Sequence, residues 1–136
     1  MILIDTNALV GLVDQSDSLN KKAAADFGKL SKRNLYVISP VLTEAVHLLR
    51  SSQSRQLLID LLNQFQIKIC PVQESDELWQ EAFVWLLGYW EHHPDWADAM
   101  LAILSGRERK FRIWTYDSEF KTIWRRPDGS RIPLAV

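Results

Sequence analysis

Short apolar runs alternate along the chain with longer segments in which apolar residues recur every three or four positions. The runs lie at residues 1–4, 35–38, 67–70 and 111–114, and their unbroken apolar character is typical of strands buried on both faces. The segments with helical spacing lie at residues 8–13, 18–30, 40–50, 55–65, 76–87, 94–104 and 118–124. This alternation predicts an α/β fold in which helices cover both faces of a parallel sheet.

Acidic residues recur where the predicted strands end. Asp5 closes the first apolar run, Glu44 lies one helical turn beyond the second, and Asp117 follows the last. Functional groups in parallel sheets gather beyond the carboxyl ends of the strands, near the point where the strand order reverses. We therefore expect these three carboxylates to converge.

Two further acids, Asp95 and Asp98, open the predicted helix 94–104 three residues apart and therefore share one helix face. Asp98 interrupts an apolar stretch in which a carboxylate has little exposed surface to occupy. Each acid singly also has a structural interpretation, because Asp5 and Asp117 are placed to cap helices, Asp95 to complement a helix dipole and Glu44 to lie on a solvated helix face. Those interpretations do not explain why the acids recur at one edge of the sheet.

Carboxylates that converge repel one another, and raised pKa values or bound cations must relieve this repulsion. A site made only of oxygen atoms suits Mg²⁺ or Mn²⁺, which keep several waters and take further ligands from a phosphate. Such ions activate water and stabilise the leaving oxygen. The pattern therefore favours phosphodiester hydrolysis.

The composition fits a single domain over residues 1–136, with 47% hydrophobic and 24% charged residues. The single cysteine, Cys70, excludes an internal disulfide framework and a Cys-rich metal site. No apolar run approaches the ~18 residues of a membrane span, so we expect a cytoplasmic protein without a membrane partner.

Charge is unevenly distributed. The net charge of −1 offers no argument for a nucleic-acid partner, but residues 1–106 carry −5 and residues 107–136 carry +4. The second stretch is either a solvated basic surface or an edge that faces a polyanion. Its basic residues are Arg107, Arg109, Lys110, Arg112, Lys121, Arg125, Arg126 and Arg131.

Four short motifs, in order, resemble those of PIN domains, and more closely those of VapC-type ribonuclease toxins from toxin–antitoxin pairs. They are Ile2–Asn7, Ser39–Glu44, Asp95–Ala99 and Trp114–Asp117. The resemblance covers essentially the whole chain. It implies a three-layer α/β/α fold around a four- to five-stranded parallel sheet.

The same resemblance implies a set of roles. Asp5, Glu44, Asp98 and Asp117 would form an acidic catalytic quartet, with Asp5 and Asp98 as metal ligands and with Asn7, Thr115 and Asp95 in support. The implied activity is Mg²⁺- or Mn²⁺-dependent endonucleolytic cleavage of RNA that leaves a 5′-phosphate and a 3′-hydroxyl. The implied partners are the RNA substrate, a second copy in a homodimer and a cognate antitoxin protein.

Two other function classes stay open. One is a PIN-like protein-binding module without catalysis, and the other is a metal-dependent phosphatase or receiver-like domain. The tryptophans are equally ambiguous. Trp79, Trp85 and Trp90 suit either core packing or a partner groove, and Trp96 and Trp124 suit either the core or stacking on unpaired bases.

Overall fold

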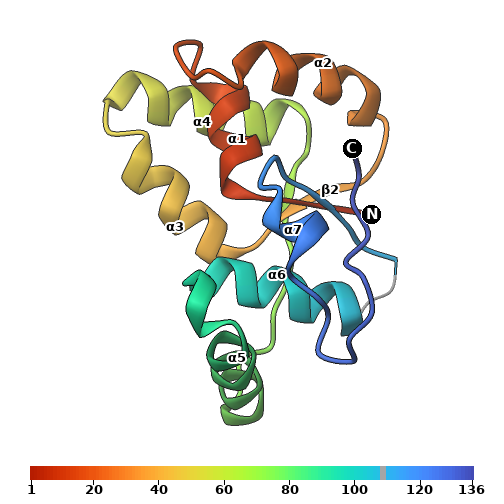
Figure 1. The fold of residues 1–136 in the computed structure, drawn as a ribbon. Helices are drawn as coiled ribbons and strands as arrows, with labels where there is room; N and C mark the ends of the chain where they lie inside the picture. Colours follow the sequence, from red (N-terminus) through yellow and green to blue (C-terminus); the bar gives the residue numbers. More distant parts are fainter. Residues whose placement is uncertain (108–109) are drawn as a thin grey trace.

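The computed structural model describes residues 1–107 and 110–136 and contains a four-stranded parallel sheet (Figure 1). Its strands are β1 (Ile2–Ile4), β2 (Leu35–Val37), β3 (Lys68–Ile69) and β4 (Arg112–Trp114), in the order β3-β2-β1-β4. The chain moves outward from β1 to β3 and then returns to the other side of β1. The strand order therefore reverses between β1 and β4, which is where a parallel sheet opens a crevice for function.

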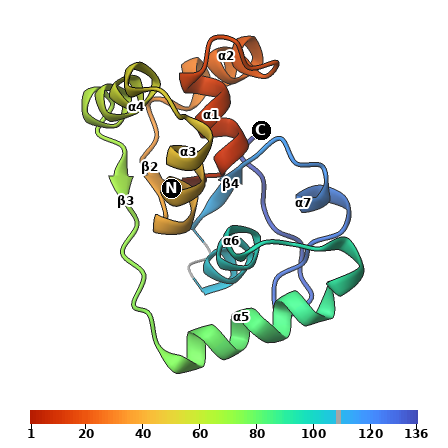
Figure 2. The same cartoon turned by 90° about the vertical axis from the view of Figure 1, so that its left-hand side faces the viewer.

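Helices cover both faces of this sheet, as Figure 2 shows. One layer contains α1 (Thr6–Val13), α2 (Asn20–Leu30), α3 (Ser39–Leu48) and α4 (Ser52–Gln64). On the opposite face α6 (Trp96–Arg107) packs on the sheet and α5 (Asp76–Gly88) packs on α6. The short helices η1 (Trp90–His92) and α7 (Glu119–Thr122) complete the described elements. The predicted α/β fold with a parallel sheet is confirmed.

The most completely buried elements of the hydrophobic core are β1 and α6. All three residues of β1 are buried, and so is the run from Ala99 to Ser105 in α6. Because α6 is buried around most of its circumference, Asp98 in its first turn is a polar residue in an apolar element. Among the described residues, none of the helices has both the length and the apolar character needed to span a membrane.

The C-terminal segment pairs with the edge strand β4, which the apolar pattern did not predict. The backbone of Ile113 donates to the carbonyl of Pro133 at 2.9 Å and accepts from the N–H of Ala135 at 2.9 Å. This pairing forms a parallel bridge between Ile113 and Leu134. The C-terminal segment therefore lies along β4, on the outer side of the sheet.

Several predicted boundaries were wrong by a few residues. The expected buried strand 67–70 is a two-residue strand at the edge of the sheet. Ile67 and Cys70 are buried as expected, but the two strand residues, Lys68 and Ile69, are exposed. The helix predicted at 55–65 begins at Ser52, since the side chain of Ser51 accepts the N–H of Ser54 and caps it. Glu108 and Arg109 lie outside the described residues, so the basic charge predicted at Arg109 has no structural description.

Candidate active site

Asp5 is the buried centre of a polar network at the carboxyl end of β1. Its Oδ1 accepts the N–H of Thr6 at 2.7 Å, which caps α1. Its Oδ2 accepts the hydroxyl of Thr115 at 2.7 Å, from the segment that follows β4. Asp5 is 5% exposed, so this carboxylate joins the two strands that flank the reversal of strand order from inside the protein.

Asn7 and Thr115 tie Asp117 to the same network. The Asn7 side-chain amide donates to Thr115 Oγ1 at 3.2 Å, and its oxygen accepts the N–H of Tyr116 at 3.0 Å. Thr115 Oγ1 also accepts the N–H of Asp117 at 3.1 Å. Asp117 in turn accepts the N–H of Glu119 through Oδ1 at 2.9 Å, at the start of α7. The loop that carries Asp117 is therefore held against Asp5 by the side chains of Asn7, from α1, and of Thr115.

Asp95 and Asp98 cap α6 reciprocally. The N–H of Asp98 donates to Asp95 Oδ1 at 2.8 Å, and the N–H of Asp95 donates to Asp98 Oδ2 at 3.0 Å. This arrangement is a capping box with aspartate in place of the usual serine and glutamate. Both carboxylates keep one oxygen outside these backbone bonds. Asp95 therefore caps α6 as well as complementing its dipole, which is the structural role expected for it, and its side chain also interacts with those of Glu44 and Asp98.

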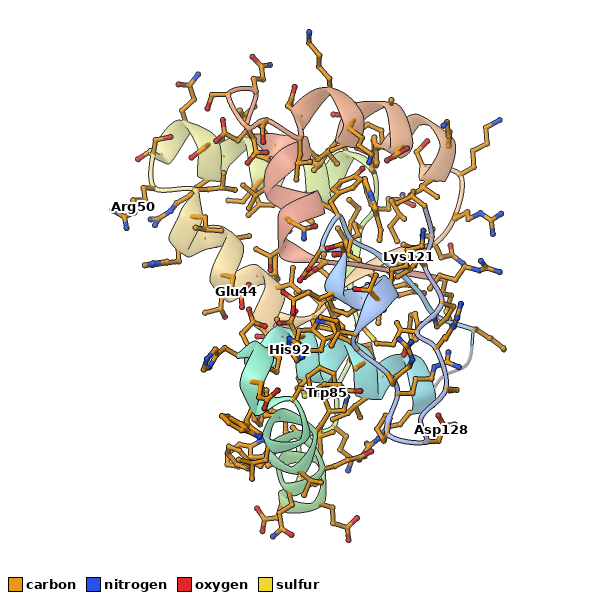
Figure 3. All side chains as sticks on the ribbon, in the orientation of Figure 1. Glu44, Arg50, Trp85, His92, Lys121 and Asp128 are labelled. Atoms are coloured by element: carbon orange, nitrogen blue, oxygen red, sulfur yellow. The ribbon has the colours of Figure 1, made fainter. Side chains whose placement is uncertain are left out.

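Glu44 reaches the site from α3, and Figure 3 labels its side chain. The hydroxyl of Thr6 donates to Glu44 Oε2 at 2.8 Å. Since Thr6 directly follows Asp5, this bond fixes the Glu44 carboxylate beside the start of α1. Glu44 is only partly exposed, so it is not the fully solvated charge that its position on a helix face would suggest.

The pKa values show that these carboxylates act on one another. Burial raises the pKa of Asp5 to about 6, against the opposing hydrogen bonds from Thr115 and Thr6, and the negative charges of Asp95 and Asp117 raise it further. Burial, together with the charges of Asp95 and Asp5, raises the pKa of Asp98 to about 8. Burial also raises the pKa of Glu44, with contributions from Asp95 and Asp5. All five acids therefore share one electrostatic environment.

No basic side chain of the described residues forms an ion pair with these acids. Within residues 1–107 and 110–136, the sole ion pair shorter than 4.0 Å joins Arg107 to Glu81, far along α6 from Asp98. The described residues also contain no ready-made group of three His, Cys, Asp or Glu side chains in a metal-binding arrangement. The site is therefore a set of mutually repelling carboxylates whose charge must be balanced by protons or by a cation from solution.

The described basic residues of 107–136 have different surroundings. Arg112 opens β4 at the opposite end of the strand from Asp117 and donates to the carbonyl of Leu134. Arg126 is buried, with its Nε 3.3 Å from the hydroxyl of Ser105. Lys121 differs from these two arginines, because it lines a surface cavity that Asp117 also lines. The interpretation of the stretch as one edge that faces a polyanion is wrong for Arg126, because its side chain is buried.

The tryptophans divide between core and surface. Trp85 and Trp124 are buried, and their rings pack edge to face at 5.5 Å. Trp124 therefore cannot stack on an unpaired base, and Trp96 packs on Phe83 instead. Trp79 in α5 and Trp90 in η1 are exposed, as are several apolar residues of α5. The most exposed of these are Val84 at 71% and Leu87 at 70%, and the exposed set comprises Trp79, Phe83, Val84, Leu87 and Trp90, here called the α5 face.

Three features of the site were not predicted from the sequence. The Thr6 bond to Glu44 was missed, although the position of Thr6 directly after Asp5 is a usable signal. The charge of Asp95 affects Asp5, Glu44 and Asp98, which makes it more central than the supporting role predicted for it. The bond between Tyr116 and Asp26 joins residues 90 positions apart and leaves no local signal.

Comparison with known proteins agrees with this architecture. The crystal structure of VapC20 from Mycobacterium tuberculosis, described as a toxin that cleaves the sarcin–ricin loop, matches with a TM-score of 0.70 at 20% sequence identity. The match covers 90% of this chain and 94% of VapC20, and at this identity it concerns the fold. No curated protein is detectably similar in sequence to this chain. The PIN domain model matches residues 2–124, from β1 to the residues that follow α7. Because that match includes both central strands and all five acids described above, the chain belongs to the PIN domain family.

Proposed function

We propose that this chain is a Mg²⁺- or Mn²⁺-dependent endoribonuclease that hydrolyses RNA phosphodiester bonds. The observation that carries the proposal is the buried Asp5, whose carboxylate is coupled electrostatically to Asp95, Asp98 and Asp117 where the strand order reverses. Groups with strongly perturbed pKa values in such a position are candidates for catalysis. Membership of the PIN domain family supports a nuclease.

The donor set fits a hard divalent cation. All candidate ligands are carboxylate oxygens, and no described basic side chain lies within ion-pair distance of them. Mg²⁺ is held in proteins by one or two carboxylates, with water and substrate phosphate as the remaining ligands, so a ready-made protein cage is unnecessary. We assign Asp5 and Asp98 as the two carboxylate ligands. A bound ion would supply Lewis acidity, polarising a phosphoryl oxygen and making water a nucleophile at neutral pH.

The remaining residues have positioning and proton-transfer roles in this proposal. Thr115 orients Asp5 through its hydroxyl, and Asn7 holds Thr115 and the backbone of Tyr116. Glu44 is fixed by Thr6 and has a raised pKa, so it suits transfer of the proton that leaves the attacking water. Asp117 adds negative charge beside Asp5 and strengthens its hold on a cation. Cleavage by water in this way would leave a 5′-phosphate and a 3′-hydroxyl.

We further propose that the protein is the toxin of a toxin–antitoxin pair and acts as a homodimer on RNA in the cytoplasm. The likeness in fold to VapC20, a toxin that cleaves RNA, supports the toxin assignment. The exposed apolar side chains of the α5 face support a protein contact, because burying such side chains against a partner is favourable. We assign this face to the homodimer and leave the antitoxin to a separate surface.

Metal dependence tests the proposed activity. We expect cleavage of RNA to disappear when EDTA is added and to return with excess Mg²⁺ or Mn²⁺, as measured by gel analysis of a labelled transcript. The 5′-phosphate of the products is checked by ligation to an acceptor RNA. Cleavage that persists in EDTA would exclude the metal mechanism. No cleavage, together with no carboxylate-dependent binding of Mn²⁺ in calorimetry, would favour the protein-binding module.

A further inference from the structure

A cavity of about 300 Å³ is lined by Asp117 and Thr115, two residues of the candidate active site. Its wall is built by three segments that are far apart in the sequence: α2, the residues from Thr115 to Lys121, and the C-terminal segment at Leu134 and Val136. This volume is at the lower end of the range of small-molecule sites. The cavity is therefore large enough for one small polar ligand.

The cavity is continuous with the candidate active site. Thr115 and Asp117 belong to its lining. The hydroxyl of Thr115 also donates to Asp5 Oδ2, so one residue contacts both the buried carboxylate and the cavity wall. A ligand in the cavity and a group held at Asp5 would consequently be immediate neighbours.

Two lysines bring positive charge to this cavity from different elements. Lys22 comes from α2, and Lys121 comes from α7, where Figure 3 labels it. Neither ammonium group lies within 4.0 Å of a carboxylate of the described residues. Lys22 Nζ lies 5.1 Å from the centre of the Tyr116 ring, an arrangement of cation over aromatic face. The cavity thus offers two cations that no acid neutralises by direct contact.

Tyr116 makes this wall rigid. Its hydroxyl donates to Asp26 Oδ2 at 2.6 Å and accepts the indole N–H of Trp114 at 3.0 Å. Burial and the bond to Asp26 raise the pKa of Tyr116, so the phenol stays protonated. Asp26 also lines the cavity, and its carboxylate holds Tyr116 and, through the ring, the position of Lys22.

We infer that this cavity holds the nucleotide of the RNA that adjoins the scissile phosphodiester, with its phosphate between Lys22 and Lys121. The inference rests on the proposed ribonuclease activity. Ammonium groups suit phosphate oxygens, and the apolar side chains of Leu134 and Val136 suit the less polar surface of a sugar or base. The acids repel a polyanion. The two lysines of the adjoining cavity, Lys22 and Lys121, supply the attraction for RNA that the acids cannot.

Binding of a labelled single-stranded RNA oligonucleotide, followed by fluorescence anisotropy, tests the inference. Asp98→Asn is used as the common background, so that cleavage does not consume the probe. We expect Lys22→Gln and Lys121→Gln each to weaken binding roughly three- to tenfold and to lower the slope of log Kd against log salt by about 0.7, as for one lost phosphate contact. Lys21→Gln is the matched control, since Lys21 is exposed on the same helix and does not line the cavity.

The inference is overturned if Lys21→Gln loses as much affinity as the two cavity variants, if the cavity variants bind like the background protein, or if the background protein does not bind the oligonucleotide. The proposed function is scored separately, as Mn²⁺-dependent cleavage by the chain without the Asp98 substitution. Absence of cleavage with the expected pattern of lysine effects would reject the activity and retain the nucleotide site. In a cleaving enzyme, Lys22→Gln and Lys121→Gln should raise KM and leave kcat within about twofold, because they contact phosphate in the ground state and transition state alike.

Discussion

The hydroxyl of Thr115 donates a 2.7 Å hydrogen bond to Oδ2 of Asp5 and so links two residues that are 110 positions apart. This bond crosses the point where the strand order reverses, from the end of β4 to the end of β1. It lowers the pKa of Asp5 against the much larger effect of burial. A single hydroxyl therefore helps to keep the central carboxylate ionised.

Removal of this hydroxyl should shift the pH dependence of activity. We expect Thr115→Val to raise the pKa of Asp5, so that the acidic limb of the pH–rate profile moves to higher pH. A shift of about one unit would lower activity on that limb about tenfold. Thr115→Ser keeps the hydroxyl and should restore the profile. The measurement is kcat/KM against pH at saturating Mn²⁺, and an unshifted Val profile would show that Thr115 does not act through Asp5.

Loss of the Asp98 charge should abolish cleavage and preserve the fold. Asp98→Asn keeps an oxygen that can accept the N–H of Asp95, so the cap of α6 survives. We expect kcat/KM to fall more than about 100-fold, since even residues that only orient metal ligands contribute about 10- to 100-fold. Asp60→Asn is the control, because Asp60 is an exposed carboxylate on α4. Near-normal cleavage by Asp98→Asn would remove this residue from the mechanism.

The metal-free protein should lose stability as the pH rises. Folding raises the pKa of Asp5 to about 6 and that of Asp98 to about 8, from 3.8 for both, so the folded state favours their protonated forms. This stabilisation is complete below pH 3.8 and is lost progressively as the pH rises through 6 to 8. Thermal unfolding in EDTA should show a Tm that decreases over this window.

Two comparisons check the cause of this pH dependence. At pH 8.0 in EDTA, close to the raised pKa of Asp98, Asp98→Asn should be more stable than the unsubstituted chain by about 1–2 kcal/mol, or roughly 3–6 °C in Tm. Added Mn²⁺ should stabilise the unsubstituted chain and have little effect on the variant. A Tm that is independent of pH in EDTA would contradict the proposed repulsion between the carboxylates.

Charge placed on the α5 face should dissociate the proposed homodimer. Val84 and Leu87 are 71% and 70% exposed, so Val84→Lys with Leu87→Lys should leave the fold of each subunit unchanged. We expect the dimer dissociation constant to rise more than about tenfold in sedimentation velocity experiments, because central apolar contacts dominate interface energies. Ile59→Lys is the control on α4, where Ile59 is 51% exposed. A dimer that tolerates both α5 substitutions would place the interface elsewhere.

The sequence identified four of the five acids by their relation to predicted strands or, for Asp98, by the break it makes in an apolar helix. Asp95 was recognised but given a minor role, because its effect depends on distances to Asp5 and Glu44 that the helix spacing does not contain. The same reasoning failed for the basic stretch after residue 106. A run of positive charge along the chain becomes a patch only if successive elements expose it on the same surface, and Arg126 is instead buried beside Ser105.

The sequence by itself determined the α/β class and the recurrence of acids at strand ends, because both follow from local periodicity and from residues adjacent in the chain. Only the tertiary structure decided which side chains meet. The bond from Thr6 to Glu44, the pairing of Tyr116 with Asp26 and the burial of Trp124 against Trp85 all depend on how separate elements pack. Burial and contact between distant segments are properties of the folded chain, and they set the pKa values and the cavity on which the proposed chemistry depends.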